Sequence, residues 1–315
     1  MRRSWFAALL IIVAAGCASA YGAQSDPDPL TNDAGGGGGT NADGSAIPAS
    51  DAVAPDTGAD TDAGVDAGET LPFASFLVLR FETDAPNGLQ VDGAWRDLSK
   101  AGRTVTIAAG TPLVASIGDA GAKAMVIGNA GPAFDLPDVA DLRFGATDDF
   151  LVVARATIEV PVDVTSGCTN HYIFAKYAGD GVTGAHLHVC SPNTGRGLMG
   201  SVKLGAGDAP IAIPTDYQPT DFTVLSFGRN QNGTRIETYG AGTSNEVTLN
   251  APIDVSAPGS PLTIGAYRYQ GTSAPSNGFI GKINRMYVYH APSGTFSKAD
   301  FDTIRTYVKD ALPRP

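Results

Sequence analysis

The chain has 315 residues, with 39 Gly, 21 Pro and a formal net charge of −11 at pH 7. Residues 1–70 contain 10 acidic and 2 basic residues and so carry −8 of this charge, while residues 71–315 contain 22 acidic and 19 basic residues and carry only −3. Such a nearly balanced folded part excludes the basic field that nucleic acid or an anionic membrane surface requires.

Residues 1–16 have the pattern of a bacterial export signal: two arginines, the apolar run Trp5–Ala15 and then small residues. Ala14, Ala15, Gly16 and Cys17 resemble the lipobox of bacterial lipoproteins, although that family usually has Leu where Ala14 stands. The resemblance implies that residues 1–16 are removed and that Cys17 carries acyl chains, which place the protein at the bacterial outer membrane, on its periplasmic side or at the cell surface. The alternative is an ordinary signal peptide that is cleaved near residues 18–20.

Residues 17–70 predict a flexible tether. They include five consecutive glycines, Gly35–Gly39, the triplet Asp-Ala-Gly at 33, 62 and 66, and no Lys or Arg. So few large apolar side chains cannot offset the entropy of ordering the chain. A flexible segment of this length spans about 40 Å on average, so it would hold the domain of residues 71–315 away from the membrane.

Short strand patterns bounded by Gly, Pro, Asn and Asp recur through residues 71–315 and predict an all-β sandwich. The expected strands include Ser75–Phe81, an alternating segment Phe150–Val160, and the pair Phe222–Gly228 and Thr234–Tyr239 around an Asn-Gly turn. Ser297 predicts the start of a short C-terminal helix with one apolar face, formed by Phe301, Ile304, Val308 and Leu312.

The segment Pro261–His290 predicts two strands joined by a Gly- and Ser-rich loop, which we interpret as a hairpin. Strict alternation along its second strand would put Ile283 and Tyr287 on one face and Met286 on the other. This pattern predicts either a β-bulge near Asn284 or a strand that is covered on both faces.

Several motifs occur in the order expected of the laminin-G-like, concanavalin A-like jelly rolls, over nearly all of residues 71–315. These motifs are Ala94–Ser99, Phe150–Arg155, Ile173–Tyr177, Asn232–Thr234, Leu262–Gly265 and Gly278–Ile283. The resemblance implies an antiparallel jelly-roll β-sandwich with a short C-terminal helix. It leaves function open, because the family includes sugar-binding modules, adhesion domains and domains attached to enzymes.

Calcium is implied by the family resemblance only. Asp148, Asp149 and Asp180 lie in expected loops, but their spacing does not match a dedicated calcium loop, and we assign no residue to a metal.

The two cysteines of the folded part, Cys168 and Cys190, predict a disulfide in an exported protein. A bridge across antiparallel strands would place Asn170 opposite His188 and Tyr172 opposite His186. Alternation then puts Tyr172, His186 and His188 on one face and His171 on the other, which argues against a three-histidine metal site. Two histidines with a third ligand from elsewhere stay an alternative.

The same face predicts a shallow sugar-binding surface, because flat rings and hydrogen-bonding groups are what such a site requires. The candidate ligand-binding residues are Tyr172, Tyr177, His186, His188, Tyr267 and Tyr269. Ordinary strand decoration is the alternative explanation for each of them.

Catalytic motifs are poorly represented. The sequence has no nucleophile elbow, no His-Glu-x-x-His and no row of closely spaced carboxylates on one strand. We therefore expect a noncatalytic module that binds carbohydrate or protein at the cell envelope, with carbohydrate favoured. The alternatives are a carbohydrate-active enzyme, such as a glycoside hydrolase or lyase with carboxylates brought together from distant strands, and a structural display protein without a small ligand.

Overall fold

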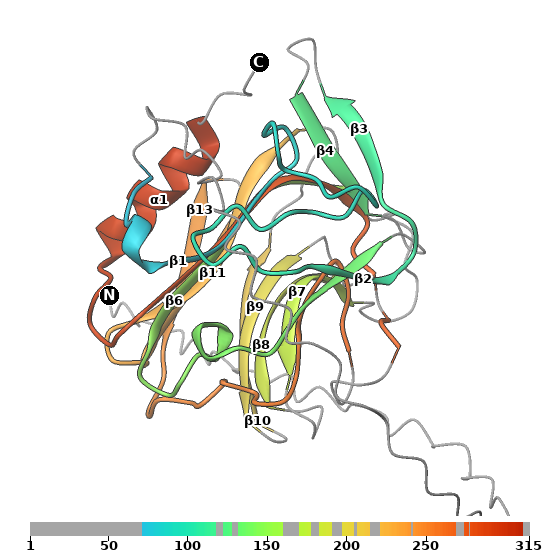
Figure 1. Ribbon diagram of the computed structural model, residues 1–315. Helices are drawn as coiled ribbons and strands as arrows, with labels where there is room; N and C mark the ends of the chain where they lie inside the picture. The colour runs from blue at the N-terminus through green and yellow to red at the C-terminus, as the bar shows by residue number, and fades with distance from the viewer. Residues whose placement is uncertain are drawn as a thin grey trace, which may run out of the picture. The chain divides into compact units, whose positions relative to one another are not determined.

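The computed structural model describes residues 71–117, 122–127, 132–159, 170–177, 183–190, 197–204, 207–214, 221–240, 242–268, 274–276 and 278–310. Within these ranges, fifteen strands form two antiparallel sheets that pack face to face as a jelly-roll β-sandwich, with one α-helix on an outer face (Figure 1). The predicted fold class is therefore confirmed.

The eight-stranded sheet has the order β13-β12-β11-β6-β15-β4-β3, and β1 also pairs with β15. Its strands are β1 (Leu77–Glu82), β3 (Leu113–Ile117), β4 (Ala122–Ile127), β6 (Asp149–Ile158), β11 (Thr223–Asn230), β12 (Arg235–Gly240), β13 (Thr243–Thr248) and β15 (Gly281–Ala291). The central strand β15 pairs with β6 on one side and with both β1 and β4 on the other.

The seven-stranded sheet has the order β10-β9-β8-β7-β14-β5-β2. Its strands are β2 (Thr106–Ala109), β5 (Ala133–Leu136), β7 (Asn170–Tyr177), β8 (Gly184–Cys190), β9 (Gly197–Leu204), β10 (Gly207–Pro214) and β14 (Leu262–Ile264). Two short 3-10 helices, η1 (Ala74–Phe76) and η2 (Ala140–Leu142), lie in connections.

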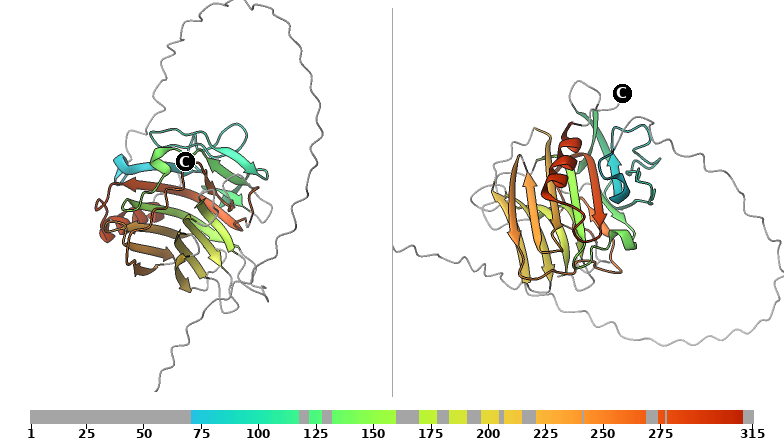
Figure 2. Two further views of the ribbon diagram at one scale, coloured as in Figure 1. Left: turned by 90° about the horizontal axis from the view of Figure 1, so that it is seen from below. Right: turned by 90° about the vertical axis from the view of Figure 1, so that its left-hand side faces the viewer.

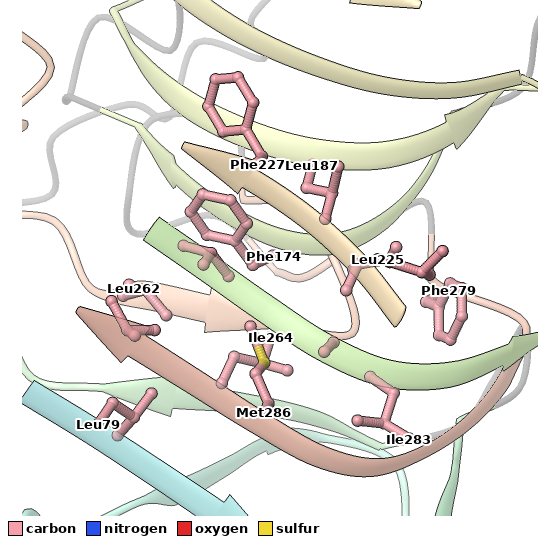
Figure 3. Packing of buried hydrophobic residues seen from close by; sticks show 14 of the residues in the cluster. Leu79, Phe174, Leu187, Leu225, Phe227, Leu262, Ile264, Phe279, Ile283 and Met286 are labelled. Carbon is pink, nitrogen blue, oxygen red and sulfur yellow. The ribbon is translucent and has the colours of Figure 1, made fainter. Parts of the chain in front are cut away.

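The core lies between the two sheets. Figure 3 shows Phe227, Leu225 and Met286 of the eight-stranded sheet packed against Phe174 and Leu187 of the seven-stranded sheet, and all five side chains are fully buried. The alternation expected for β6 is confirmed, because its even-numbered residues from 150 to 158 all point into this core.

The hairpin expected within Pro261–His290 is wrong. β14 pairs with β5 and β7 in the seven-stranded sheet, whereas β15 lies in the eight-stranded sheet. The loop between them therefore crosses from one layer of the sandwich to the other. Two adjacent strand patterns along a sequence do not reveal which sheet each one joins.

The predicted β-bulge in β15 is confirmed. The pairing of β15 with β6 shifts between Ile283 and Arg285, so that Asn284 is the extra residue. Ile283 and Met286 both reach the core, while Tyr287 packs on the opposite face of the sheet. The strand is also covered on both faces, so both explanations of its broken alternation hold.

Helix α1 (Lys298–Asp310) covers part of the outer face of the eight-stranded sheet, where it packs on Leu151, Val153 and Tyr287 (Figure 2). Ser297 begins it as predicted: the Ser297 hydroxyl accepts a hydrogen bond from Asp300 N at 3.2 Å, and the Asp300 carboxylate accepts one from Ser297 N at 2.7 Å.

Gly228 of β11 lets the helix approach closely. A Cβ atom there would lie 2.8 Å from the Phe301 ring. A larger residue at this position would therefore push the helix away from the sheet.

The predicted hairpin of β11 and β12 is confirmed, and Asn230 pairs with Arg235 across its turn. Gln231, Asn232 and Gly233 have positive φ angles of 54°, 60° and 79°. These are left-handed conformations, which Asn and Gly adopt more readily than most residues.

The segment Ala94–Ser99 has a structural role. Trp95 stacks on Phe81 at 5.1 Å in the core, and its indole N–H donates to Thr83. The buried Asp97 carboxylate accepts hydrogen bonds from the backbone N–H groups of Arg80, Ser99 and Arg103.

Within the part of the chain that the structure describes, no helix is long and apolar enough to cross a membrane. The signal segment 1–16, the lipidation site Cys17 and the tether 17–70 lie outside the described residues, as do Cys168, Asp180, Tyr269 and Leu312.

Helix docking generates a stability prediction. Arg305 of α1 is only 3% exposed, and its guanidinium donates to Glu237 at 2.9 Å and to Ser226 at 2.9 Å. Replacing Arg305 by Ala leaves the buried Glu237 carboxylate without this partner, and we expect the free energy of unfolding to fall by about 3–5 kcal/mol in urea titrations.

The double variant Arg305→Met with Glu237→Leu is the matched control. It removes both charges, and we expect it to recover most of the lost stability. A loss below about 1 kcal/mol in Arg305→Ala would contradict a docking role for this ion pair.

Candidate functional site

The outer face of the seven-stranded sheet carries two rows of side chains that run across its strands. The first row follows the register from β5 to β9 and consists of Asp135, Thr263, Ala175, His186 and Ser201. The second row consists of Tyr172, His188 and Met199. The predicted candidates on β7 and β8 therefore belong to one continuous face.

A β-bulge in β7 brings its two tyrosines to this face. Strict alternation would put Tyr172 and Tyr177 on opposite faces, since they are an odd number of residues apart. The pairing of β7 with β8 shifts between Tyr172 and Phe174, so Ile173 and Phe174 both enter the core. Tyr172, Ala175 and Tyr177 then pack together on the outside.

Tyr267 joins this cluster from the loop after β14. Gly265 N donates to the carbonyl of Ile173, which holds the start of the loop against β7. The Tyr267 ring stacks on Tyr172 with 4.9 Å between centroids and meets Tyr177 edge-on at 4.8 Å. The structure thus brings together five of the six predicted ligand-binding residues, and the sixth, Tyr269, is not described.

The histidines complete the cluster. The His186 and His188 rings lie 4.8 Å apart, and Tyr172 contacts both, with centroids at 5.4 Å and 5.1 Å. The Tyr177 hydroxyl is hydrogen-bonded to His186 Nδ1. His171 points away from this group as predicted, and its Nδ1 lies 2.9 Å from the carbonyl oxygen of Gly278.

The open platform expected from the sequence is not what the structure has. Tyr172 and Tyr177 are each 5% exposed, His186 is 3% exposed and His188 is 4% exposed. Only Tyr267 is half-buried and so reaches solvent. A ligand would meet this cluster at Tyr267, because the other four rings are enclosed.

Enclosure changes the chemistry of His188. Burial, and secondarily the nearby His171, lowers the pKa of His188 to about 3, because a charged imidazolium is poorly solvated there. His188 Nδ1 has no hydrogen-bond partner among the described residues. The ring therefore stays neutral at physiological pH and acts as part of an aromatic surface.

A polar pair lies beside the rings. Asp135 accepts two hydrogen bonds from Arg268, at 3.2 Å and 2.6 Å, and a third from the Thr263 hydroxyl at 2.9 Å. Asp135 and Arg268 are both half-buried, and Arg268 directly follows Tyr267. Sequence reasoning missed this pair, because Asp135 and Arg268 are distant in the chain and meet only through the pairing of β5 with β14.

The predicted register of β7 against β8 is wrong by two residues between Asn170 and Tyr172, at the start of β7. Tyr172 faces His188, not His186, and Asn170 faces Cys190, not His188. The expected grouping of Tyr172, His186 and His188 on one face nevertheless holds. A bridge between Cys168 and Cys190 stays a prediction, because Cys168 lies outside the described residues.

Two of the three acidic residues expected in loops, Asp148 and Asp149, are described, and both make structural hydrogen bonds. Asp148 accepts a hydrogen bond from Gly145 N at 2.7 Å and lies 3.0 Å from His290 Nε2, while Asp149 accepts one from Phe296 N at 2.8 Å. Both carboxylates thus hold loops in place. In the described ranges no group of three or more His, Cys, Asp or Glu side chains is arranged to hold a metal ion.

A search against protein-family models found no match, and a search of curated proteins also found none. Solved structures do match. The binding domain of Paraclostridial Mosquitocidal Protein 1 superposes with a TM-score of 0.50 at 13% identity, over 74% of this chain and 53% of that one. The binding domain of Botulinum Neurotoxin serotype G gives a TM-score of 0.50 at 12% identity, over 73% of this chain and 50% of that one.

A third match is domain 4 of AbnA, an extracellular arabinanase from Geobacillus stearothermophilus, solved with arabinotriose. It has a TM-score of 0.49 at 15% identity, over 73% of this chain and 98% of that one. The present chain spans about half the length of the first two structures. At these identities the likeness to the two binding domains shows a shared β-sandwich fold and nothing finer.

The low pKa of His188 generates a prediction about acid stability. In the unfolded chain His188 has its ordinary pKa of about 6.5. Between about pH 6.5 and pH 3 its imidazole is therefore protonated in the unfolded chain and neutral in the folded one. Stability is therefore lost as the pH falls through this window, by on the order of 2 kcal/mol between pH 7 and pH 5.

Urea unfolding at pH 7 and pH 5 measures this loss, and His188→Gln should reduce it. His290→Gln is the control, since His290 is half-buried at the opposite sheet. An unchanged pH dependence in His188→Gln would contradict the burial of a neutral ring.

Proposed function

We propose that residues 71–315 form a noncatalytic binding module that recognises carbohydrate through the face built around Tyr267. The observation that carries this proposal is the stacked pair of Tyr267 and Tyr172, with Tyr267 half-buried beside the Asp135–Arg268 pair. An aromatic ring packs on the C–H face of a sugar, and a neighbouring carboxylate and guanidinium can hydrogen-bond its hydroxyl groups.

The enclosed rings support this role by holding Tyr267 in place. Tyr172 contacts Tyr267 face to face, while Tyr177 contacts it edge-on. A ring fixed in this way loses little conformational entropy when a ligand binds, so more of the contact energy is retained as affinity. The four enclosed residues are positioning residues in this proposal, and Tyr267 is the contact residue.

The noncatalytic part of the proposal is supported by how the carboxylates of this face are used. Asp135 is engaged by Arg268 and Thr263, and the other candidates there are histidine and tyrosine side chains, not carboxylates. Glycosidases need two carboxyl groups that flank the scissile bond. The fold also supports a binding role, since two of the solved structures that share it are binding domains.

The contribution of Tyr267 can be tested by substitution. We expect the protein to bind one or more members of a glycan array, and Tyr267→Ala to weaken that binding by about tenfold, because it removes both the buried area of the ring and an aromatic contact of about 0.5–1.5 kcal/mol. Tyr267→Phe keeps the ring and should retain most of the affinity.

Leu113→Ala serves as a surface control, because Leu113 is 60% exposed on the edge strand of the other sheet. If the protein bound no glycan with or without calcium, or if Tyr267→Ala bound as well as the unaltered protein, this function would be refuted. Hydrolysis of a bound glycan would instead favour the enzyme alternative.

We further propose that the module is exported and anchored to the bacterial outer membrane through lipid on Cys17, with residues 17–70 as its tether. The support is the sequence itself: the apolar segment before Cys17 and the uniform negative charge after it. Two or more acyl chains are sufficient for stable anchoring without a spanning helix.

Labelling of growing cells with radioactive palmitate tests the anchor. The unaltered protein should carry the label and sediment with membranes, whereas Cys17→Ser should lose both properties. Unlabelled protein that is nevertheless exported would indicate the ordinary signal peptide.

A further inference from the structure

Strand β3 forms one end of the eight-stranded sheet, and its outer edge is open. β3 pairs with β4 on one side, and within the described residues no strand pairs with its other side (Figure 1). In the same part of the chain, no loop backbone donates a hydrogen bond to β3 or accepts one from it. An open edge presents a row of backbone N–H and C=O groups that another strand can bind.

The sequence of β3 does not protect this edge. Its five residues, Leu-Val-Ala-Ser-Ile, include no charged residue and no Pro, and its pairing with β4 is regular, without a bulge. Charges, Pro and bulges are the features that usually prevent an edge strand from pairing. β13, at the opposite end of the same sheet, is protected, because its Glu246 is in ion pairs with Arg235 and Lys298.

Exposed apolar side chains gather at the β3 edge. Among the described residues three large apolar side chains are exposed, and two of them, Val91 at 107% and Leu113 at 60%, lie here. Leu113 begins β3. The loop that carries Val91 lies beside it, since a Cβ atom on Gly93 would come within 3.3 Å of the Pro112 side chain. Exposed apolar side chains that gather in this way indicate a contact with another protein chain.

β3 is complementary to a second copy of itself. If two β3 strands pair antiparallel with Ala115 opposite Ala115, then Leu113 of each lies opposite Ile117 of the other. These three residues point to one face of the sheet, opposite to Val114, which packs on the core. The sheet therefore continues into the second copy with apolar pairs, and no like charges meet along the two strands.

Charges at the two ends of β3 favour the same arrangement. Asp92 is exposed near the start of β3, in the loop that approaches Pro112. Lys123 is exposed near the end of β3, because it lies opposite Ser116 in the pairing with β4. In a twofold pair the start of one strand lies beside the end of the other, so each Asp92 comes to the side of Lys123 of the second copy. A parallel pair would instead bring like charges together.

We propose that β3 is the site at which two copies of this chain form a twofold, antiparallel dimer that continues the eight-stranded sheet. Two five-residue strands bury a small area compared with the roughly 1,600 Å² of a standard stable interface, so the dimer is weak and reversible. It leaves the Tyr267 face of each copy free, because that face is on the other sheet. The dimer does not depend on sugar binding.

Sedimentation velocity of the purified protein tests the dimer, with Cys17→Ser so that acyl chains cannot drive association. We expect a monomer at about 1 µM and an increasing share of dimer towards about 1 mM. No larger species should form, because the twofold contact uses the open β3 edge of both copies. A chain that stays monomeric over this range overturns the proposal, and so does growth into larger oligomers.

Substitution at the twofold axis identifies the contact. Ala115→Lys places two like charges opposite each other and should weaken dimerisation by about tenfold or more, as should Ala115→Glu. A mixture of the two variants pairs Lys with Glu and should form a heterodimer under conditions where neither variant dimerises alone. Ser244→Lys puts the same charge on the protected edge strand β13 and should dimerise as the unaltered protein does.

A dimer that survives Ala115→Lys lies elsewhere on the molecule and overturns the proposal. Amide hydrogen exchange gives a readout in the unaltered protein that does not depend on the folding of any variant. Exchange of the β3 amides should slow as the protein concentration rises, while exchange of the β13 amides stays the same. Unchanged exchange of the β3 amides in a dimeric sample overturns the proposal whatever the variants do.

Discussion

Alternation of side chains along a strand is the constraint on which this structure depends, and two β-bulges adjust it. A strand directs successive side chains to opposite faces, so one extra residue exchanges the faces of everything that follows. In β15 the extra residue is Asn284, which returns Met286 to the core and turns Arg285 outward. In β7 the shift after Tyr172 does the same for Tyr177.

The proposed sugar-binding face depends on the bulge in β7. Without the shift in β7, Tyr177 would point into the core and could not bond to His186. Without the shift in β15, Arg285 would enter the core and Arg155 would have no cationic neighbour across the strand pair. Bulges are common where a protein must re-aim a side chain, and here each one places a polar or aromatic group on an outer face.

The sequence predicted the fold class, the C-terminal helix, the hairpin of β11 and β12 and the bulge at Asn284, because each depends on a local pattern. It did not predict that β14 and β15 join different sheets, since strand pairing depends on contacts between distant segments. The β7 register was wrong because it was anchored on one assumed contact between cysteines. The bulge in β7 left no broken alternation that could be recognised, because Ile173 and Phe174 are both apolar.

The sequence predicted which residues form the candidate site, but not how far they are exposed to solvent. Sequence patterns grouped Tyr172, His186 and His188 on one face, yet burial depends on what packs over that face and on how the rings pack against one another. The outcome changes which residue meets a ligand: Tyr267 lies at the boundary between the enclosed rings and the Asp135–Arg268 pair.

The two outer faces therefore differ in chemistry in a way that neither composition nor net charge could indicate. The seven-stranded face combines tyrosine and histidine rings with a carboxylate that is already paired with Arg268, which suits an uncharged, hydroxyl-rich ligand. The eight-stranded face is instead covered in part by helix α1, which is fixed there by the buried ion pair of Arg305 and Glu237. Since stacked sheets lie about 10 Å apart with a packed core between them, a ligand on one face does not contact the other. A sugar at the site proposed around Tyr267 would therefore not contact the helix-covered face, and a substitution at Tyr267, which lies outside the core cluster, tests that site without altering the packing between the sheets.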